Sequence, residues 1–146
     1  MNLRPAKRTD LDELVRLERD CFGAEAWSPA MVLEEITGLG RAYFVIEANN
    51  GALAGAGGVS LGKDFAEIIT IEVDPSAQGQ GFGRLLMDKL IQMAEEAGLT
   101  RVLLEVAEAN ALAIGLYHSM GFATIDRRPG YYQPSGQDAL VMELLL

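Results

Sequence analysis

Three glycines lie within five positions of the segment Gln78-Gly79-Gln80-Gly81-Phe82-Gly83-Arg84. Glycine lets the backbone turn tightly and approach a ligand closely, because it has no Cβ. Apolar residues then recur at helical spacing, at Leu85, Leu86, Leu90, Met93, Ala94 and Ala97, so we expect a helix to begin at the glycines. Its unpaired amides and positive dipole end would face the loop. The segment therefore predicts a site for an anion of about the size of a phosphate.

Two common nucleotide motifs do not fit this segment. The dinucleotide motif Gly-x-Gly-x-x-Gly needs a third glycine at the position of Arg84, and no Gly-Lys-Ser or Gly-Lys-Thr follows for a triphosphate loop. The pattern that does fit is Gln-x-x-Gly-x-Gly, formed by Gln78, Gly81 and Gly83. It comes directly after an apolar run that ends in Val73-Asp74-Pro75.

A second residue that could take part in catalysis is Glu105, which lies inside the apolar run Val102-Leu103-Leu104-Glu105-Val106. A carboxylate in such a run is expected to be partly desolvated, which favours its neutral form and makes it a stronger base. The residues alone equally allow a glutamate that reaches solvent at a strand end or pairs with a neighbouring cation. No cluster of His, Cys and carboxylates has the spacing of metal ligands, so we expect no metal.

Composition restricts the class of protein. The 146 residues, 49% of them hydrophobic and 23% charged, are enough for one folded domain, residues 1–146. No apolar run has the length of a membrane span, the first residues lack a signal-peptide core, and Cys21 has no partner for an internal disulfide. A cytoplasmic protein without membrane contact is therefore expected. The formal charge of −9 argues against direct binding of nucleic acid and favours a cationic partner, or none.

The periodicity predicts alternating strands and helices that would position the glycine loop and Glu105. Strands are expected at 2–6, 41–48, 52–62, 65–73, 101–106, 122–127 and 139–145. Helices are expected over about twelve residues to Phe22, with Thr9 and Asp12 as a capping box, then from Ser28-Pro29 to Gly38 or Gly40, from the glycine loop to Gly98, and from Asn110 to Met120. Asn50-Gly51 predicts a hairpin turn. Gly55, Gly57 and Gly58 indicate that their strand is bulged or closely approached by another backbone.

The Gln78-x-x-Gly81-x-Gly83 pattern resembles the acetyl-coenzyme A signature of the GNAT acetyltransferase superfamily. The resemblance extends over almost the whole chain and includes Leu103-Leu104-Glu105-Val106, Asn110, Ala113, Leu116-Tyr117 and Met120-Gly121-Phe122. Within the superfamily the chain is most similar to ribosomal-protein alanine N-acetyltransferases of the RimI type, through Ala26-Trp27-Ser28 and Tyr131-Tyr132-Gln133-Pro134. Ala26 stands where those enzymes often have a proline.

The resemblance implies a mixed α/β (α+β) fold. Its central sheet would have about seven mostly antiparallel strands, with helices on both faces and a splayed strand pair that holds acetyl-CoA. Backbone groups of Ile71, Glu72 and Val73 would pair with the pantetheine arm, and the amides from Gly79 to Arg84 would hold the pyrophosphate. The implied cofactor-binding residues are Ile71, Glu72, Val73, Gln78, Gly79, Gln80, Gly81, Phe82, Gly83, Arg84 and Asn110.

The resemblance also implies the catalytic residues. Glu105 would be the general base that takes the proton of the attacking amine, with Glu72 as the main alternative. Tyr117 would be the general acid, because a hydroxyl donor helps a thiolate to leave. Tyr117 also shares a helix face with Ala113, Leu116 and Met120, so a packed core aromatic remains an alternative.

Four residues are candidates for the acceptor site, namely Trp27, Ser28, Tyr131 and Tyr132. The alternatives are a hydrophobic plug between two helices for Trp27 and a packed loop for the two tyrosines. A peptide α-amine is favoured weakly as the acceptor, because its neutralisation at pH 7 costs about 1 to 1.4 kcal/mol, against roughly 4.6 kcal/mol for a lysine amine.

Together these expectations predict an enzyme that transfers an acetyl group from acetyl-CoA to a protein α-amine, with the N-terminal alanine of a small-subunit ribosomal protein as the acceptor. Two other functions stay open at this point. One is an acetyltransferase for a lysine side chain or a small amine, and the other is a non-catalytic acyl-CoA-binding module that regulates a partner. The oligomeric state is also open.

Overall fold

The computed structural model describes Met1–Leu146 and contains one seven-stranded sheet, in the order β1-β2-β3-β4-β5-β7-β6. The strands are β1 Asn2–Pro5, β2 Arg41–Glu47, β3 Leu53–Leu61, β4 Ala66–Val73, β5 Arg101–Ala107, β6 Ala123–Arg128 and β7 Ala139–Leu145. The helices are α1 Leu11–Phe22, α2 Pro29–Thr37, α3 Phe82–Glu96 and α4 Ala111–Ser119, and three 3-10 turns lie at Arg8–Asp10, Gly23–Glu25 and Pro75–Ala77. None of the helices has both the length and the apolar character needed to cross a bilayer.

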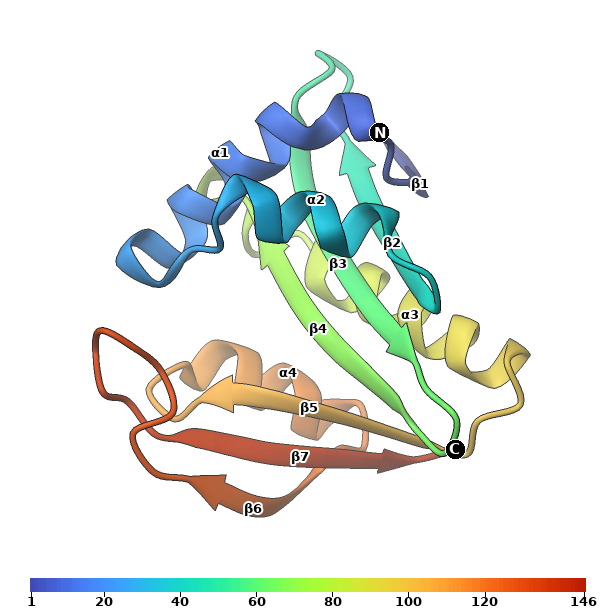
Figure 1. Cartoon of the computed structure of the whole chain (residues 1–146), viewed down its shortest axis with the longest axis vertical. Helices are drawn as coiled ribbons and strands as arrows, with labels where there is room; N and C mark the ends of the chain where they lie inside the picture. Colours follow the sequence, from blue (N-terminus) through green and yellow to red (C-terminus); the bar gives the residue numbers. More distant parts are fainter.

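The sheet is mixed and mostly antiparallel, as the sequence predicts. All neighbouring strands run antiparallel except β4 and β5, which are parallel. The parallel contact is short, with only Ala66–Ile68 of β4 paired to Val102–Leu104 of β5. Beyond these residues the two strands part, and Figure 1 shows them opening as a V towards the C-terminal ends of both strands.

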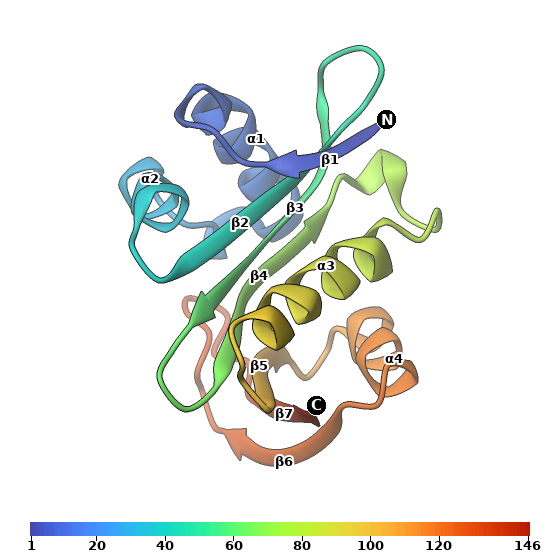
Figure 2. The same cartoon turned by 90° about the vertical axis from the view of Figure 1, so that its right-hand side faces the viewer.

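Two pairs of helices cover opposite faces of the sheet, as Figures 1 and 2 show from perpendicular directions. The helices α1 and α2 lie on one face, where Leu14, Leu17 and Val32 are buried against β2 and β3. The helix α3 lies on the other face, and its Leu86 and Leu90 are fully buried in the larger core. The helix α4 lies beside α3 and contributes Tyr117 to the same core.

The glycine-rich strand β3 is closely approached by another backbone, as predicted, because a Cβ on Gly55 would lie 3.1 Å from the backbone oxygen of Glu72. Side chains also lie close to this strand. A Cβ on Gly57 would lie 2.8 Å from the Ile71 side chain, and one on Gly58 would lie 2.7 Å from the Tyr43 ring. The predicted bulge in β3 is also present, with Ala54 as the extra residue opposite β2, and β4 carries a second bulge opposite β3. Gly58 pairs with Thr70 and the next residue of β3 pairs with Ile68, so Ile69 has no partner. The bulge changes the direction in which the side chains of β4 point after this position.

The start of α1 differs from the sequence prediction. Thr9 and Asp12 do not form a capping box; a 3-10 turn, Arg8–Asp10, precedes the helix instead. The Asp10 carboxylate accepts from the backbone N–H of Lys7 at 2.7 Å and binds the Arg4 guanidinium with two contacts of 2.9 Å. This charged partner comes from β1, and a local sequence pattern does not reveal it.

Candidate active site

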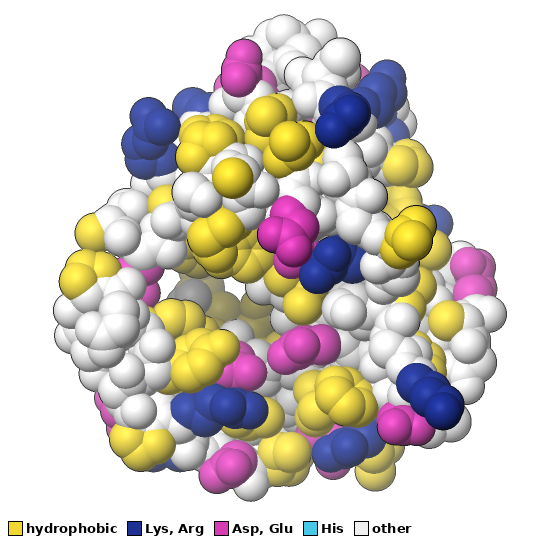
Figure 3. All heavy atoms as spheres, viewed as in Figure 1, with side chains coloured by type: hydrophobic (Ala, Val, Ile, Leu, Met, Phe, Trp, Pro, Cys, Tyr) yellow, Lys and Arg dark blue, Asp and Glu magenta, His cyan; other side chains and the backbone are white.

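The parting of β4 and β5 opens into two cavities that meet at the splay. One measures about 360 Å³ and the other about 270 Å³, and both are lined by Ile71, Asn110 and Tyr117. On the face that carries α1 and α2, Figure 3 shows a deep hollow with acidic side chains near its rim. The two cavities together provide a path through the sheet where no strand closes it.

The smaller cavity is lined by the glycine loop. Its lining residues are Ile71, Val73, Gln78, Gly79, Gly81, Phe82, Gly83, Arg84, Asn110, Leu112, Ala113, Leu116 and Tyr117. All of the predicted loop residues except Gln80 are among them. Gly79 and Gly81 have φ angles of +81° and +82°, which side-chain-bearing residues adopt only with strain, and Gly81 directly precedes the first turn of α3. The loop therefore presents free amides and the positive end of a helix to this cavity.

The strand β4 turns alternate side chains to opposite faces of the sheet at this point. Ile71 and Val73 line the smaller cavity, whereas the Glu72 side chain points to α1 and is only 3% exposed. The hydroxyl of Tyr43 donates to Glu72 Oε1 at 3.3 Å. Glu72 is paired with Ala56 of β3, so its backbone faces that strand and not the splay, and its carboxyl group lines neither cavity.

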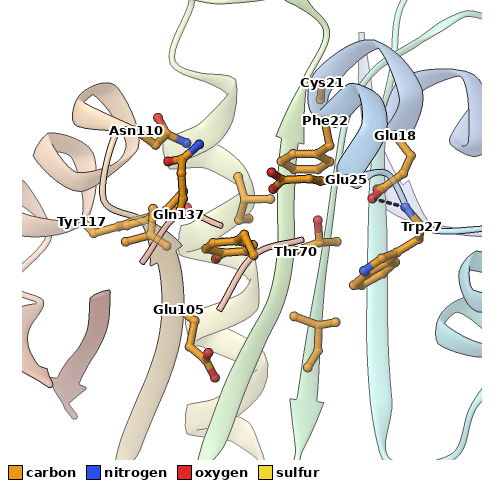
Figure 4. A pocket seen from close by; sticks show the side chains of 15 residues that line it. Glu18, Cys21, Phe22, Glu25, Trp27, Thr70, Glu105, Asn110, Tyr117 and Gln137 are labelled. Atoms are coloured by element: carbon orange, nitrogen blue, oxygen red, sulfur yellow. Dashed lines mark hydrogen bonds between the residues drawn. The ribbon is translucent and has the colours of Figure 1, made fainter. Parts of the chain in front are cut away.

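The larger cavity lies between α1, the splay and the β6–β7 loop (Figure 4). It is lined by Glu18, Cys21, Phe22, Glu25, Trp27, Ile69, Thr70, Ile71, Glu105, Val106, Ala107, Asn110, Tyr117, Tyr132 and Gln137. Three of these residues are glutamates and none is a lysine or arginine. The cavity is thus suited to a positively charged or neutral group and unfavourable for an anion.

Glu105 lies on β5 with its side chain on the face of the larger cavity. The side chain is 16% exposed, and Oε2 lies 3.4 Å from Nε of Arg128 on the edge strand β6. This contact is an ion pair and not a hydrogen bond, because Oε2 has no hydrogen-bond partner. The Arg128 guanidinium also lies over the Tyr131 ring, 5.7 Å from its centroid. The sequence allowed two interpretations of Glu105, a partly desolvated carboxylate and a carboxylate paired with a cation. Both features are present in the structure.

Tyr117 and Asn110 lie where the two cavities meet. Tyr117 is 7% exposed, and its ring packs at 5.9 Å from the Phe122 ring, so it is a core aromatic that also lines both cavities. Burial raises the pKa of Tyr117 to about 12, which keeps its hydroxyl protonated at neutral pH. Asn110 caps α4, its Oδ1 accepting from the N–H of Ala113 at 3.2 Å.

The four predicted acceptor-site residues are not all in the same place. Trp27 and Tyr132 both line the larger cavity. Tyr131 is 48% exposed and packs edge-on against Tyr132 at 5.1 Å, outside the lining. Ser28 is not a lining residue, because its Oγ accepts from the N–H of Met31 at 3.2 Å and caps α2. The contribution of Ser28 is therefore to fix the start of α2, next to the cavity residue Trp27.

Sequence reasoning missed several lining residues, above all Glu18, Glu25, Thr70 and Gln137. Glu18 carried a usable signal, because it interrupts the apolar stripe of a helix face that must be buried. Glu25, Thr70 and Gln137 carried none, since polar residues in loops and strands are common. No group of three or more His, Cys, Asp or Glu residues is arranged to hold a metal ion.

Comparison with known proteins gives consistent matches. Residues 11–122 match the model of the "Acetyltransferase (GNAT) family". The N-alpha-acetyltransferase RimI of Mycobacterium tuberculosis is 37% identical over 140 residues, covering 92% of this chain and 86% of the relative.

Two solved structures are also similar over nearly the whole chain. The ribosomal-protein-S18-alanine N-acetyltransferase of Escherichia coli superposes with a TM-score of 0.88 at 32% identity, over 99% of this chain and 92% of that one. The Salmonella typhimurium protein yncA, solved with its cofactor acetyl-CoA, gives a TM-score of 0.82 at 25% identity, over 100% and 94% of the two chains.

The larger cavity contains a thiol, Cys21, that is unsuited to act as a nucleophile. Its Sγ donates to the carbonyl oxygen of Val73 at 3.3 Å. Burial, with the nearby carboxyl group of Glu72, raises the pKa of Cys21 to about 12. The thiolate is the reactive form, and it is scarce at neutral pH when the pKa is this high. A reaction that passes through an acylated cysteine is therefore disfavoured in this cavity.

At pH 8 the thiol of the folded protein should react with Ellman's reagent at least about 100-fold more slowly than the thiol of the urea-unfolded chain, because the thiolate fraction is so small. The absorbance of the released thionitrobenzoate measures both rates, and Cys21→Ser provides the blank. Equal rates in the folded and unfolded protein would show that Cys21 is ionised and accessible.

Proposed function

The chain belongs to the GNAT acetyltransferase family and is an acetyl-CoA-dependent N-acetyltransferase, and we propose that its acceptor is the N-terminal α-amine of a protein, specifically the N-terminal alanine of a small-subunit ribosomal protein. The observation that carries this proposal is the meeting of a glycine-loop cavity with a carboxylate-lined cavity at Tyr117. The M. tuberculosis N-alpha-acetyltransferase and the E. coli S18-alanine N-acetyltransferase support the choice of acceptor.

The splay and the glycine loop suit the two ends of acetyl-CoA. Past Ile68 the backbone of β4 has no partner in β5, so Ile71 and Val73 can pair with the amide-bearing pantetheine arm as with another strand. The loop from Gly79 to Arg84, at the positive end of α3, can hold the pyrophosphate. When bound, acetyl-CoA supplies an acyl group activated as a thioester.

Glu105 is the base in this proposal. It lines the larger cavity together with Trp27 and Tyr132, which would hold the peptide that carries the amine. An α-amine needs little help to lose its proton at neutral pH, so a carboxylate acting directly or through a water is sufficient. Arg128 keeps the carboxylate oriented from the edge of the sheet. The buried Glu72 is the weaker candidate, since its carboxyl group lines neither cavity.

Tyr117 is the donor to the leaving sulfur. Its hydroxyl has a pKa of about 12, and full transfer to the conjugate base of a thiol with a pKa of about 8.5 would cost roughly 5 kcal/mol. A hydrogen bond to a charged acceptor is instead worth about 1.5 to 3 kcal/mol. We therefore assign Tyr117 the role of donating a hydrogen bond to the sulfur as negative charge develops on it.

A panel of acceptors tests the function as a whole. With acetyl-CoA, a peptide that starts with a free alanine should turn over at least about tenfold faster, in kcat/KM, than the same peptide blocked at its N-terminus and carrying a lysine, or than a polyamine. Thiol release gives the rate, and mass spectrometry locates the acetyl group. Faster reaction of the lysine peptide or the polyamine would contradict the proposed acceptor. No turnover with any of them would favour the non-catalytic module.

Glu105→Gln tests the base. We expect kcat to fall by about 10²- to 10⁴-fold, most strongly at lower pH, where more of the acceptor is ammonium. The Kd for acetyl-CoA should stay nearly unchanged, because Glu105 does not line the glycine-loop cavity. Glu67→Gln is a matched control, since Glu67 is the neighbouring carboxylate on β4 and lines neither cavity. An unchanged rate in Glu105→Gln would assign the base role to another carboxylate.

Tyr117→Phe tests the donor to sulfur. Loss of a hydrogen bond to a developing thiolate should lower kcat by about 10- to 100-fold, while the ring still packs on Phe122 and preserves the fold. The loss should shrink with an acetyl thioester whose leaving thiol is more acidic, because that sulfur needs less stabilisation. Full activity, or an equal loss with both thioesters, would leave Tyr117 with packing alone.

A further inference from the structure

Two carboxyl groups are buried under α1, and that of Glu18 lies within hydrogen-bonding reach of that of Glu72 on the cofactor strand β4. Glu18 is 2% exposed and Glu72 is 3% exposed. The backbone N–H of Trp27 donates to Glu18 Oε1 at 3.0 Å, a bond drawn in Figure 4, and the Tyr43 hydroxyl donates to Glu72 Oε1 at 3.3 Å. The second oxygen of each carboxyl group is buried without another partner.

Neither carboxyl group has a cation of its own. The field of Arg16 on α1 reaches Glu72, but the Arg16 guanidinium is bound by Glu13, Asp20 and Asp74. Two buried carboxylates without a cation cannot both be ionised at low cost. One proton held between the two second oxygens would satisfy both atoms at once, with one carboxyl donating and the other accepting.

The other titratable groups around the pair do not supply or remove this proton at neutral pH. The Cys21 thiol on α1 has its pKa raised to about 12, and burial raises the pKa of Tyr43 on β2 well above its usual value. Glu35 of α2 and Asp74 after β4 act only through their charge, and both add negative potential. Burial, followed by the neighbouring Glu18, raises the pKa of Glu72 well above the usual range of a carboxyl group.

We propose that Glu18 and Glu72 share one proton, and that the pair is a positioning device that holds Trp27, a wall of the acceptor cavity, against the cofactor strand. Glu72 lies between Ile71 and Val73, the residues turned to the smaller cavity, and Glu18 binds the Trp27 backbone. The pair thus ties the acceptor wall to the strand that presents the cofactor. The effect of this pair on acceptor binding rests on the proposed function. The sharing of a proton between Glu18 and Glu72 does not depend on it.

The pH dependence follows from the raised pKa of Glu72. The shared proton is present at low pH and is lost as pH rises through this raised value. Two adjacent buried carboxylates then repel each other, and the bond from Trp27 to Glu18 loses its fixed geometry. We expect the acceptor wall to loosen as pH rises through the raised pKa of Glu72.

Trp27 is the only tryptophan, so its fluorescence reports on the pair without any reaction. In the wild type the emission should shift with a titration that lies well above the usual range of a carboxyl group. In Glu72→Gln the shift should be absent, because the introduced side-chain amide can donate to Glu18 but does not titrate. Glu34→Gln, an exposed change on α2, should titrate like the wild type. A wild type that shows no titration below pH 10, or a Glu72→Gln variant that keeps it, would overturn the shared proton.

The second measurement concerns the acceptor. The ratio of the acceptor KM of the wild type to that of Glu72→Gln should rise at least about threefold from pH 7 to pH 9.5; the amine titrates identically with both enzymes and cancels. Glu18→Met, which removes the acceptor of the Trp27 N–H, should raise the acceptor KM about tenfold at every pH while the KM for acetyl-CoA stays within about twofold. A constant ratio together with an unchanged KM in Glu18→Met would overturn the positioning role. A wild type that acetylates no α-amine would refute the proposed function instead, and the fluorescence test of the pair would still decide.

Discussion

The site depends on one constraint, which is that β4 and β5 pair over only three residues and then part. Backbone N–H and C=O groups that leave a sheet must find other partners, because an unpaired buried peptide group is costly. On the open side of β4 the backbone groups at Ile71 and Val73 face a cavity and no strand, and side chains of Cys21 and Gln78 donate to the Val73 carbonyl oxygen there. A ligand with an amide-bearing arm fits this edge as another strand would. The same parting also joins the cavities on the two faces of the sheet, so that a group held on one face can meet a group held on the other.

The two cavities differ in charge although the chain carries a net charge of −9. At one end, the start of α3 and Arg84 supply positive potential for an anion. At the other end, Glu18, Glu25 and Glu105 face a space that no lysine or arginine lines. A reaction that brings an anionic cofactor and an amine together needs this separation, because each ligand enters from the side whose field attracts it. Tyr117 lies at the boundary, buried enough to stay protonated and open enough to line both cavities.

Two features of β4 direct its side chains. The bulge at Ile69 changes their direction in mid-strand, and the alternation that follows sends Ile71 to one face and Glu72 to the other. The strand therefore takes part in two different environments. One is the edge available to the cofactor, and the other is the buried carboxyl pair with Glu18, which lies behind the Trp27 wall. The strand β4 is therefore one direct connection between the two ends of the site, beside Asn110 and Tyr117, which line both cavities.

The sequence by itself determined the strands and helices, the Asn50-Gly51 hairpin and the glycine loop, because each rests on local periodicity or on a local need for a positive φ angle. Its resemblance to the GNAT superfamily also led to the mixed sheet and to Glu105 and Tyr117. Only the tertiary structure decided which side chains share a cavity. It placed Ser28 at a helix cap, Arg128 against Glu105, Asp10 on Arg4 and Glu18 beside Glu72. These partners come from elements far apart in the chain, and burial decides what each polar group must bind. The spacing of residues along one segment predicts neither the distance between strands nor which polar side chains lose their contact with solvent.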